Sequence, residues 1–178
     1  MGGIPPRAGP VNETVEFLLR STLIGAGATL LIDTWAAVLQ RFGVPSLNFA
    51  LLGRWIGHIP RGRWHHESIA KAAPVRGELT LGWCAHYGIG ISFAALLLAC
   101  FGLQWGRSPT LLPALLVGMV TVVAPLFLLQ PALGAGIASS KTPAPVFNSV
   151  KSLITHTIFG VGLFLAARAT AALVPLGG

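Results

Sequence analysis

Hydrophobic positions along this chain are gathered into four long blocks, separated by shorter polar segments. We place these blocks at residues 17–40, 80–104, 110–130 and 151–174. A hydrocarbon core of about 30 Å is crossed by about 20 helical residues, and each block reaches that length. The pattern therefore predicts an all-α, polytopic membrane protein folded as a bundle of four transmembrane helices.

Composition agrees with the pattern and limits the number of domains. The chain is 53% hydrophobic with a mean hydropathy of +0.73, and 10% of its residues are charged, against about 25% in soluble domains. Little sequence remains outside the four blocks for a soluble unit. We therefore expect a single membrane domain over residues 1–178.

The two long connections differ in pattern. Segment 41–79 contains five apolar residues at helical spacing, opposite Arg54 and His58: Phe49, Leu52, Trp55, Ile56 and Ile59. This spacing predicts a short helix lying in the membrane interface, and the i, i+4 spacing of Glu67 and Lys71 predicts an ion pair. Segment 131–150 is rich in Gly, Ser and Pro, which predicts an irregular loop.

The basic residues are divided unequally between the two predicted sides of the membrane. Eight lie on the side of the two long connections: Arg41, Arg54, Arg61, Arg63, Lys71, Arg76, Lys141 and Lys151. Four lie on the side of the termini: Arg7, Arg20, Arg107 and Arg168. The positive-inside rule then predicts that loops 41–79 and 131–150 are cytoplasmic and that both termini face out. In such a protein the net charge of +7 indicates orientation and lipid-headgroup contact, not nucleic acid. We expect Arg20 and Arg168 to snorkel to the interface.

Small and polar residues recur every three or four positions in each block, and such stripes favour close helix contact in lipid. The first block contributes Thr22, Ala26, Thr29, Asp33, Ala36, Ala37 and Gln40. The second contributes Gly82, His86, Gly90 and Ala94, the third Ala114, Gly118, Thr121 and Pro125, and the fourth Ser152, His156, Gly160 and Ala167. We expect all four stripes to face the interior of the bundle.

One acid and three other polar side chains occupy similar depths in these blocks. An ionised acid near the bilayer centre costs at least about 2.5 to 3.5 kcal/mol, so Asp33 needs partners. Counted at about 1.5 Å per residue, Asp33, His86, Gln130 and His156 lie within roughly 10 Å of the loop side. We predict that these four side chains form a binding site for a proton or a cation, with no catalytic residue assigned. Tyr87 is expected to be an interfacial anchor instead.

A second candidate site lies in the first long connection. Arg54, His58, Arg61 and Arg63 are placed to contact an anion or a lipid headgroup. Metal and cofactor signals are weak: the five histidines form no HxxHH box, and Cys84 and Cys100 are too far apart along one helix for a disulfide or a zinc site. The sequence therefore identifies no metal and no cofactor.

Several local motifs occur in a distinctive order: GRWIGH, GWCAHY, QPALGAGIA and THTIFGVGL. In this order, and from about residue 20 to residue 170, the chain resembles the bacterial membrane family catalogued as domain of unknown function 2938 (DUF2938). The resemblance implies a small multi-pass protein of the bacterial inner membrane with about four spans; its termini would then be periplasmic by the positive-inside rule. It implies no activity.

Three classes of function stay open at this point. The first is a small transporter or permease whose site contains Asp33, with the lipid bilayer and a second copy of the chain as partners. The second is an enzyme or binding protein for lipid, or a haem protein with His86 and His156 as axial ligands. The third is an accessory subunit of a larger membrane complex, in which the polar residues only hold the helices together.

Overall fold

The structure is a computed structural model that describes residues 12–173. Its α-helices are α1 (Glu13–Arg41), α2 (Phe49–His58), α3 (Glu78–Arg107), α4 (Leu111–Val120), α5 (Gln130–Ala132) and α6 (Pro145–Leu173). Shorter helical pieces are η1 (Ile59–Arg61), η2 (Ile69–Lys71), η4 (Ile137–Ser139) and the π-helical segment η3 (Ala124–Leu129). The predicted all-α class is confirmed.

Four helical segments are long and apolar enough to cross a membrane: Glu13–Arg41, Glu78–Arg107, Leu111–Ala132 and Pro145–Leu173. The predicted number of spans is therefore confirmed, and each span extends beyond its predicted bounds at one end or at both. The first helix begins at Glu13 instead of residue 17, and the last begins at Pro145 instead of residue 151. Arg7, and the predicted end of the last helix at residue 174, lie outside the described residues.

Local capping explains where the helices begin. The side chain of Asn12 accepts a hydrogen bond from the Thr14 amide at 2.8 Å, and Asn48 accepts one from the Ala50 amide at 3.0 Å. Such N-caps satisfy amide groups that have no partner within the helix. Pro145 opens α6, where the missing amide hydrogen costs nothing. The loop predicted at 131–150 is shorter for this reason.

The sequence predicted one helix over 110–130, but the third span of the structure is not a continuous α-helix. Proline has no amide hydrogen, so Pro125 cannot continue the α-helical pattern. The backbone instead turns more widely over Ala124–Leu129, and the Gln130 amide donates to the Pro125 carbonyl, five residues earlier. A π-helical segment thus accommodates Pro125, and the backbone of the span stays hydrogen-bonded after it.

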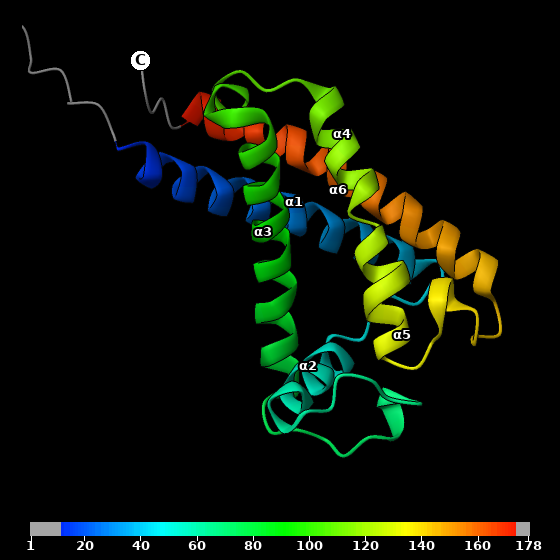
Figure 1. Ribbon diagram of the computed structural model, residues 1–178. Coiled ribbons are helices and arrows are strands. Elements are labelled where there is room, and N and C mark those ends of the chain that lie inside the picture. The colour runs from blue at the N-terminus through cyan, green and yellow to red at the C-terminus, as the bar shows by residue number, and fades with distance from the viewer. Residues whose placement is uncertain (1–11, 174–178) are drawn as a thin grey trace, which may run out of the picture.

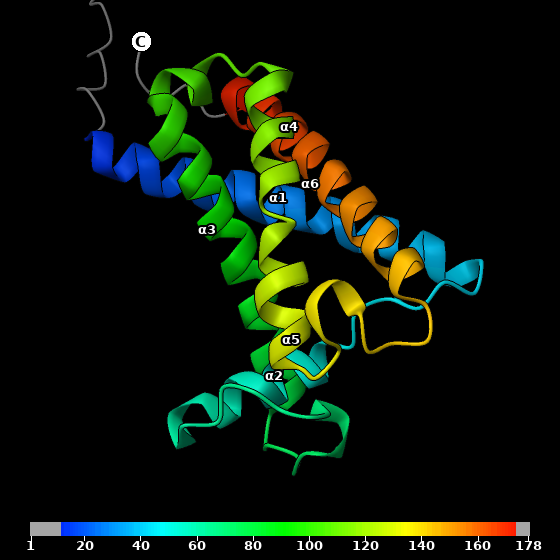
Figure 2. The ribbon, with the colours of Figure 1, turned by 45° about the vertical axis from the view of Figure 1, so that its right-hand side comes forward.

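The helices form a chain of neighbours that does not close into a ring. In Figures 1 and 2, α1 (blue) passes steeply across α3 (green), and α6 (orange to red) returns along α1. Among the spanning helices the extensive contacts are α1 with α3, α1 with α6, and α4 with α6, whereas α3 and α4 contact each other sparsely. The α1–α6 pair therefore connects α3 to the third span.

Glycines lie at the crossing points, where two helix backbones come into direct contact. A β-carbon added at Gly25 of α1 would overlap the Ile91 backbone of α3. One added at Gly118 of α4 would lie 2.5 Å from Gly160 Cα of α6. Small residues are favoured at such contacts in lipid because association there depends on close packing and not on the hydrophobic effect.

The predicted stripes are confirmed for α3 and only in part for α1. Gly82, Gly90 and Ala94 are buried on α3. On α1, Thr29 is buried, but Thr22, Ala37 and Gln40 are exposed. The buried positions of α1 are Glu16, Arg20, Ser21, Ile24, Gly25, Ala28 and Thr29, because two helices, α3 and α6, cover it from different sides.

The apolar core lies toward the α3–α4 connection. It contains Ile24, Ala28, Ala94, Leu97, Leu98, Trp105, Ala114, Val117, Phe159, Leu163 and Ala167. Other large apolar side chains point outward, such as Leu112, Val120 and Leu128, which are 65–69% exposed. Outward-facing apolar surface on spans of this length is what a lipid bilayer would cover.

At the opposite end, α2 and the two long loops pack together. Gly53 of α2 lies against the Glu78 carbonyl, and Gly82 of α3 lies against the Phe49 carbonyl. The His66 amide donates to the Ala132 carbonyl at 2.9 Å. Both long connections therefore meet at one end of the molecule, visible below α3 and α5 in Figures 1 and 2.

The α1–α3 crossing predicts a sharp difference between two glycines. Gly25→Ala should lower the free energy of unfolding by about 1–3 kcal/mol, as overpacking does, because the new β-carbon would force the two helices apart. Gly88→Ala is the matched control, since its β-carbon would meet nothing within 4 Å. Unfolding in mixed detergent micelles, followed by circular dichroism, measures both. Equal stability of the two variants would contradict the close crossing.

Candidate functional site

Asp33 of α1 and two neighbouring residues of α3 form the polar contact between these helices. His86 Nε2 lies 2.9 Å from Asp33 Oδ1, and the Tyr87 hydroxyl donates to Asp33 Oδ2 at 3.0 Å. Asp33 is eight residues before the end of α1 and His86 eight after the start of α3, about 12 Å along each helix. The carboxylate thus has a donor on each oxygen.

Aromatic side chains enclose this contact. The ring of Phe49, from α2, lies 4.6 Å from the His86 ring, and the Trp83 ring lies 5.9 Å from it in an edge-on arrangement. The side chains of Asp33 and His86 are each 18% exposed. The pair is therefore largely shielded by apolar surface but still accessible.

The hydrogen-bond pattern fixes how a neutral His86 is protonated. An ionised carboxylate only accepts, so Nε2 carries the hydrogen that points at Asp33. The lone pair then lies on Nδ1, which has no hydrogen-bond partner in the described part of the chain. Asp33 orients the imidazole and leaves one basic nitrogen available, which suits the pair to accept a proton or to bind a cation.

The two other predicted members of the site lie between the third span and α6. The Thr121 hydroxyl donates to the Gly118 carbonyl, so its oxygen accepts from His156 Nδ1 at 3.1 Å. Gln130 Nε2 donates to the Ser152 hydroxyl at 3.4 Å. Within residues 12–173, no hydrogen bond joins these groups to Asp33 or His86. Their union in a single four-helix site stays a prediction.

Arg54 holds three segments of the chain together. Its guanidinium donates to both oxygens of Glu78, at 2.9 and 2.8 Å, and one nitrogen donates to the Ile69, Ala70 and Ala72 carbonyls. Glu78 accordingly raises the pKa of Arg54. The structure thus gives this predicted headgroup ligand an internal set of partners. Arg61 and Arg63, by contrast, are exposed.

His58, also predicted to contact an anion, is buried and paired with His66. The Ala73 carbonyl can only accept, so His58 Nε2 carries a hydrogen toward it at 3.1 Å. A neutral His58 therefore accepts at Nδ1 from His66 Nε2, 2.9 Å away. His66 Nδ1 is then an unprotonated, buried atom without a hydrogen-bond partner among the described residues. Burial and the neighbouring His58 lower the pKa of His66.

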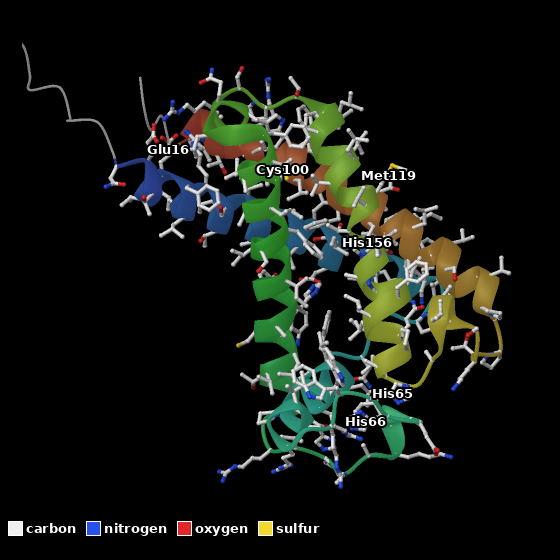
Figure 3. All side chains as sticks on the ribbon, viewed as in Figure 1. Glu16, His65, His66, Cys100, Met119 and His156 are labelled. Carbon is white, nitrogen blue, oxygen red and sulfur yellow. The ribbon has the colours of Figure 1, made fainter. Side chains whose placement is uncertain are left out.

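A buried charge cluster closes the other end of the molecule, opposite His65 and His66 (Figure 3). Glu16 is fully buried, 2.8 Å from Arg20 and bonded to Arg107 through two nitrogens at 3.0 and 2.6 Å. Arg20 also donates to the Gly106 carbonyl. The prediction that Arg20 snorkels was wrong, because the acid four residues earlier pairs with it inside the protein.

Several residues of these clusters were missed or misassigned by the sequence analysis. Tyr87 contacts Asp33 although it was expected to be an interfacial anchor, and its position next to His86 was a usable signal. The i, i+4 spacing of Glu16 and Arg20 was another. The expected ion pair between Glu67 and Lys71 is not among those of the described residues.

No group of three or more His, Cys, Asp or Glu side chains could hold a metal ion in the described part of the chain. The fold and the site define an all-α protein with four candidate membrane spans and a half-buried Asp–His pair between two of them. Residues 22–170 match the family described as protein of unknown function (DUF2938). The chain belongs to that family, as its motifs predicted. No curated protein and no solved structure matches it.

The His58–His66 contact predicts pH-dependent docking of loop 62–72. Since docking lowers the pKa of His66 from 6.5, the undocked loop binds protons more readily, and docking should be complete above pH 6.5 and weaken as the pH falls below it. Hydrogen exchange of this loop, corrected for intrinsic rates, should therefore be faster at pH 5.5 than at pH 7.5.

Two variants isolate the responsible histidine. His66→Gln keeps a donor for His58 but cannot titrate, so its loop exchange should not depend on pH after correction. His65→Gln, at the exposed neighbouring position, should keep the dependence of the native chain. A dependence that survives in His66→Gln would show that another group controls docking.

Proposed function

We propose that this membrane protein is a small transporter of the bacterial inner membrane that binds a proton or a cation at Asp33 and His86. The observation that carries the proposal is the 2.9 Å contact between His86 Nε2 and Asp33 Oδ1, on helices long enough to span a bilayer. Ionisable residues in such segments are costly and usually mark ion pathways or proton relays.

Either a proton or a monovalent cation can neutralise the net charge of the Asp33–His86 pair. With a neutral His86 and an ionised Asp33, the pair has a net charge of −1 in a poorly solvated environment. A proton on His86 Nδ1 neutralises the pair, and so does a monovalent cation at the carboxylate. Because either loading removes the same uncompensated charge, proton and cation would compete for the site.

The remaining predicted members are assigned supporting roles in the same proposal. His156, held by Thr121, and Gln130, held by Ser152, offer further polar groups between the third span and α6. Four spans leave little room for alternating access in a single chain, so we propose that transport requires a dimer.

The orientation of the chain follows the basic residues. We propose that the end formed by α2 and the two long loops is cytoplasmic and that the termini are periplasmic. Arg61 and Arg63, which are exposed at the loop end, would contact anionic headgroups. Arg54 and His58 would contribute by holding the loop in place.

Proton binding can be tested before a substrate is known. A pH step applied to proteoliposomes on a solid-supported membrane should displace charge in the native protein, because His86 takes up a proton within the membrane. Asp33→Asn should lose this displacement, since the carboxylate that stabilises the charged imidazole is gone. The same vesicles can then be screened for pH-dependent flux of small cations and metabolites.

Glu13→Gln is the matched control, because Glu13 is an exposed acid at the start of the same helix. It should keep the charge displacement of the native protein. Equal displacement in Asp33→Asn and the native chain would contradict the proposal. So would a native protein without displacement whose Asp33→Asn variant only loses stability, which is the outcome expected of an accessory subunit.

A further inference from the structure

The loop end of the molecule contains a cavity that belongs to none of the clusters described above. It has a volume of about 300 Å³ and is lined by His65, Pro131, Gly136, Ile137, Ser140 and Lys141. His65 comes from the loop after α2, Pro131 from α5, and the other residues from the segment between α5 and α6. Figure 3 shows His65 beside the lower end of α5. Both docked loops therefore contribute to the cavity.

Three lining side chains can donate hydrogen bonds to a ligand. Lys141 contributes an ammonium group, Ser140 a hydroxyl and His65 an imidazole. None of these side chains has a hydrogen bond or an ion pair with another described residue, and none of the lining residues is an acid. The donors are thus free to bind an anion.

The surrounding sequence reinforces the positive charge. Segment 42–77 contains one acid, Glu67, against Arg54, Arg61, Arg63, Lys71 and Arg76, and segment 133–144 contains Lys141 and no acid. Of these cations, Arg54 is neutralised by Glu78. The remaining charge would attract an anion to the cavity.

Backbone hydrogen bonds hold the two loops that line the cavity. The Ile69 amide donates to the Leu133 carbonyl at 3.0 Å, and the Lys141 amide donates to the Ala135 carbonyl at 2.9 Å. Ala138 and Ser139 both have positive φ, at 49° and 60°, and the Ser149 hydroxyl donates to the Ala138 carbonyl. Such backbone persists only where its surroundings hold it, and it clusters at ligand sites.

We propose that this cavity binds a phosphate group through Lys141, Ser140 and His65. A tetrahedral anion with several acceptor oxygens matches a cation and two further donors that line one cavity from two loops. The cavity volume is at the lower end of the range for small-molecule sites, which suits a phosphate with a small substituent. The ligand is either a phospholipid headgroup or a soluble phosphate compound. This inference does not depend on the proposed transport function.

Two binding measurements on the full-length protein distinguish the sources. Isothermal titration of delipidated protein in detergent with inorganic phosphate tests the soluble source. Native mass spectrometry during titration with phosphatidylglycerol, against phosphatidylcholine, tests the headgroup source. Binding in either measurement, weakened about tenfold or more by Lys141→Gln, is the expected result. Binding of phosphatidylglycerol alone would assign the site to the lipid.

Lys71→Gln is the matched control, since Lys71 is an exposed lysine of the other loop that does not line the cavity. It should leave the affinity within about twofold of the native value, because Lys71 contributes only to the surrounding charge, which salt screens, and makes no contact in the cavity. Equal weakening by Lys71→Gln and Lys141→Gln would overturn the proposal, as would the absence of binding in both titrations. Ser140→Ala should also weaken binding. It provides a second test of the site if Lys141→Gln fails to fold.

Discussion

Direct contact between helix backbones at the glycine crossings determines where every other group lies. In lipid, apolar side chains gain little by leaving the solvent, so close approach of small residues must supply the packing. On α1 the contact positions with α3 proceed from Gly25 through Thr29 to Asp33, and on α3 from Gly90 to His86. The Asp–His pair is thus a continuation of the crossing, one to two turns beyond it.

Charged groups close the two ends of this arrangement in different ways. At one end Glu16 joins α1 to the end of α3 through Arg20 and Arg107. At the other, Arg54 joins α2 to the start of α3 and to the loop carbonyls. Each acid in these clusters is matched by an arginine with several donors, which is the arrangement that makes burial of a carboxylate tolerable.

The sequence could predict which residues of a helix face the interior of the bundle, but not which residues of other helices they contact. Spacing of three and four residues placed Gly82, Gly90 and Ala94 correctly inside, because that spacing follows from helix geometry alone. It could not say which helix lies across from a face, so Asp33, His86, Gln130 and His156 were grouped by depth. The described hydrogen bonds instead link them in pairs, with Tyr87, Thr121 and Ser152 as the partners.

Side-chain length explains why Tyr87 was misplaced. It is 100° around the helix from His86, yet at a crossing this close its hydroxyl still reaches the second oxygen of Asp33. Pro125 is a similar case. Its missing amide hydrogen was visible in the sequence, but whether the helix would kink there or adopt the π-helical turn was not.

The sparse contact between α3 and α4 means that the two spans are held together mainly at their ends. The two spans are joined by the short turn after Arg107 at one end, and by backbone hydrogen bonds between the two long loops at the other. Between these ends, α3 has few direct contacts with the third span. It packs against α1, which packs against α6, and α6 packs against the third span. The loop contacts therefore limit how far α3, with His86, can separate from α4 and α5. The same contacts form the cavity beside Lys141, so a ligand held there by both loops would strengthen the restraint.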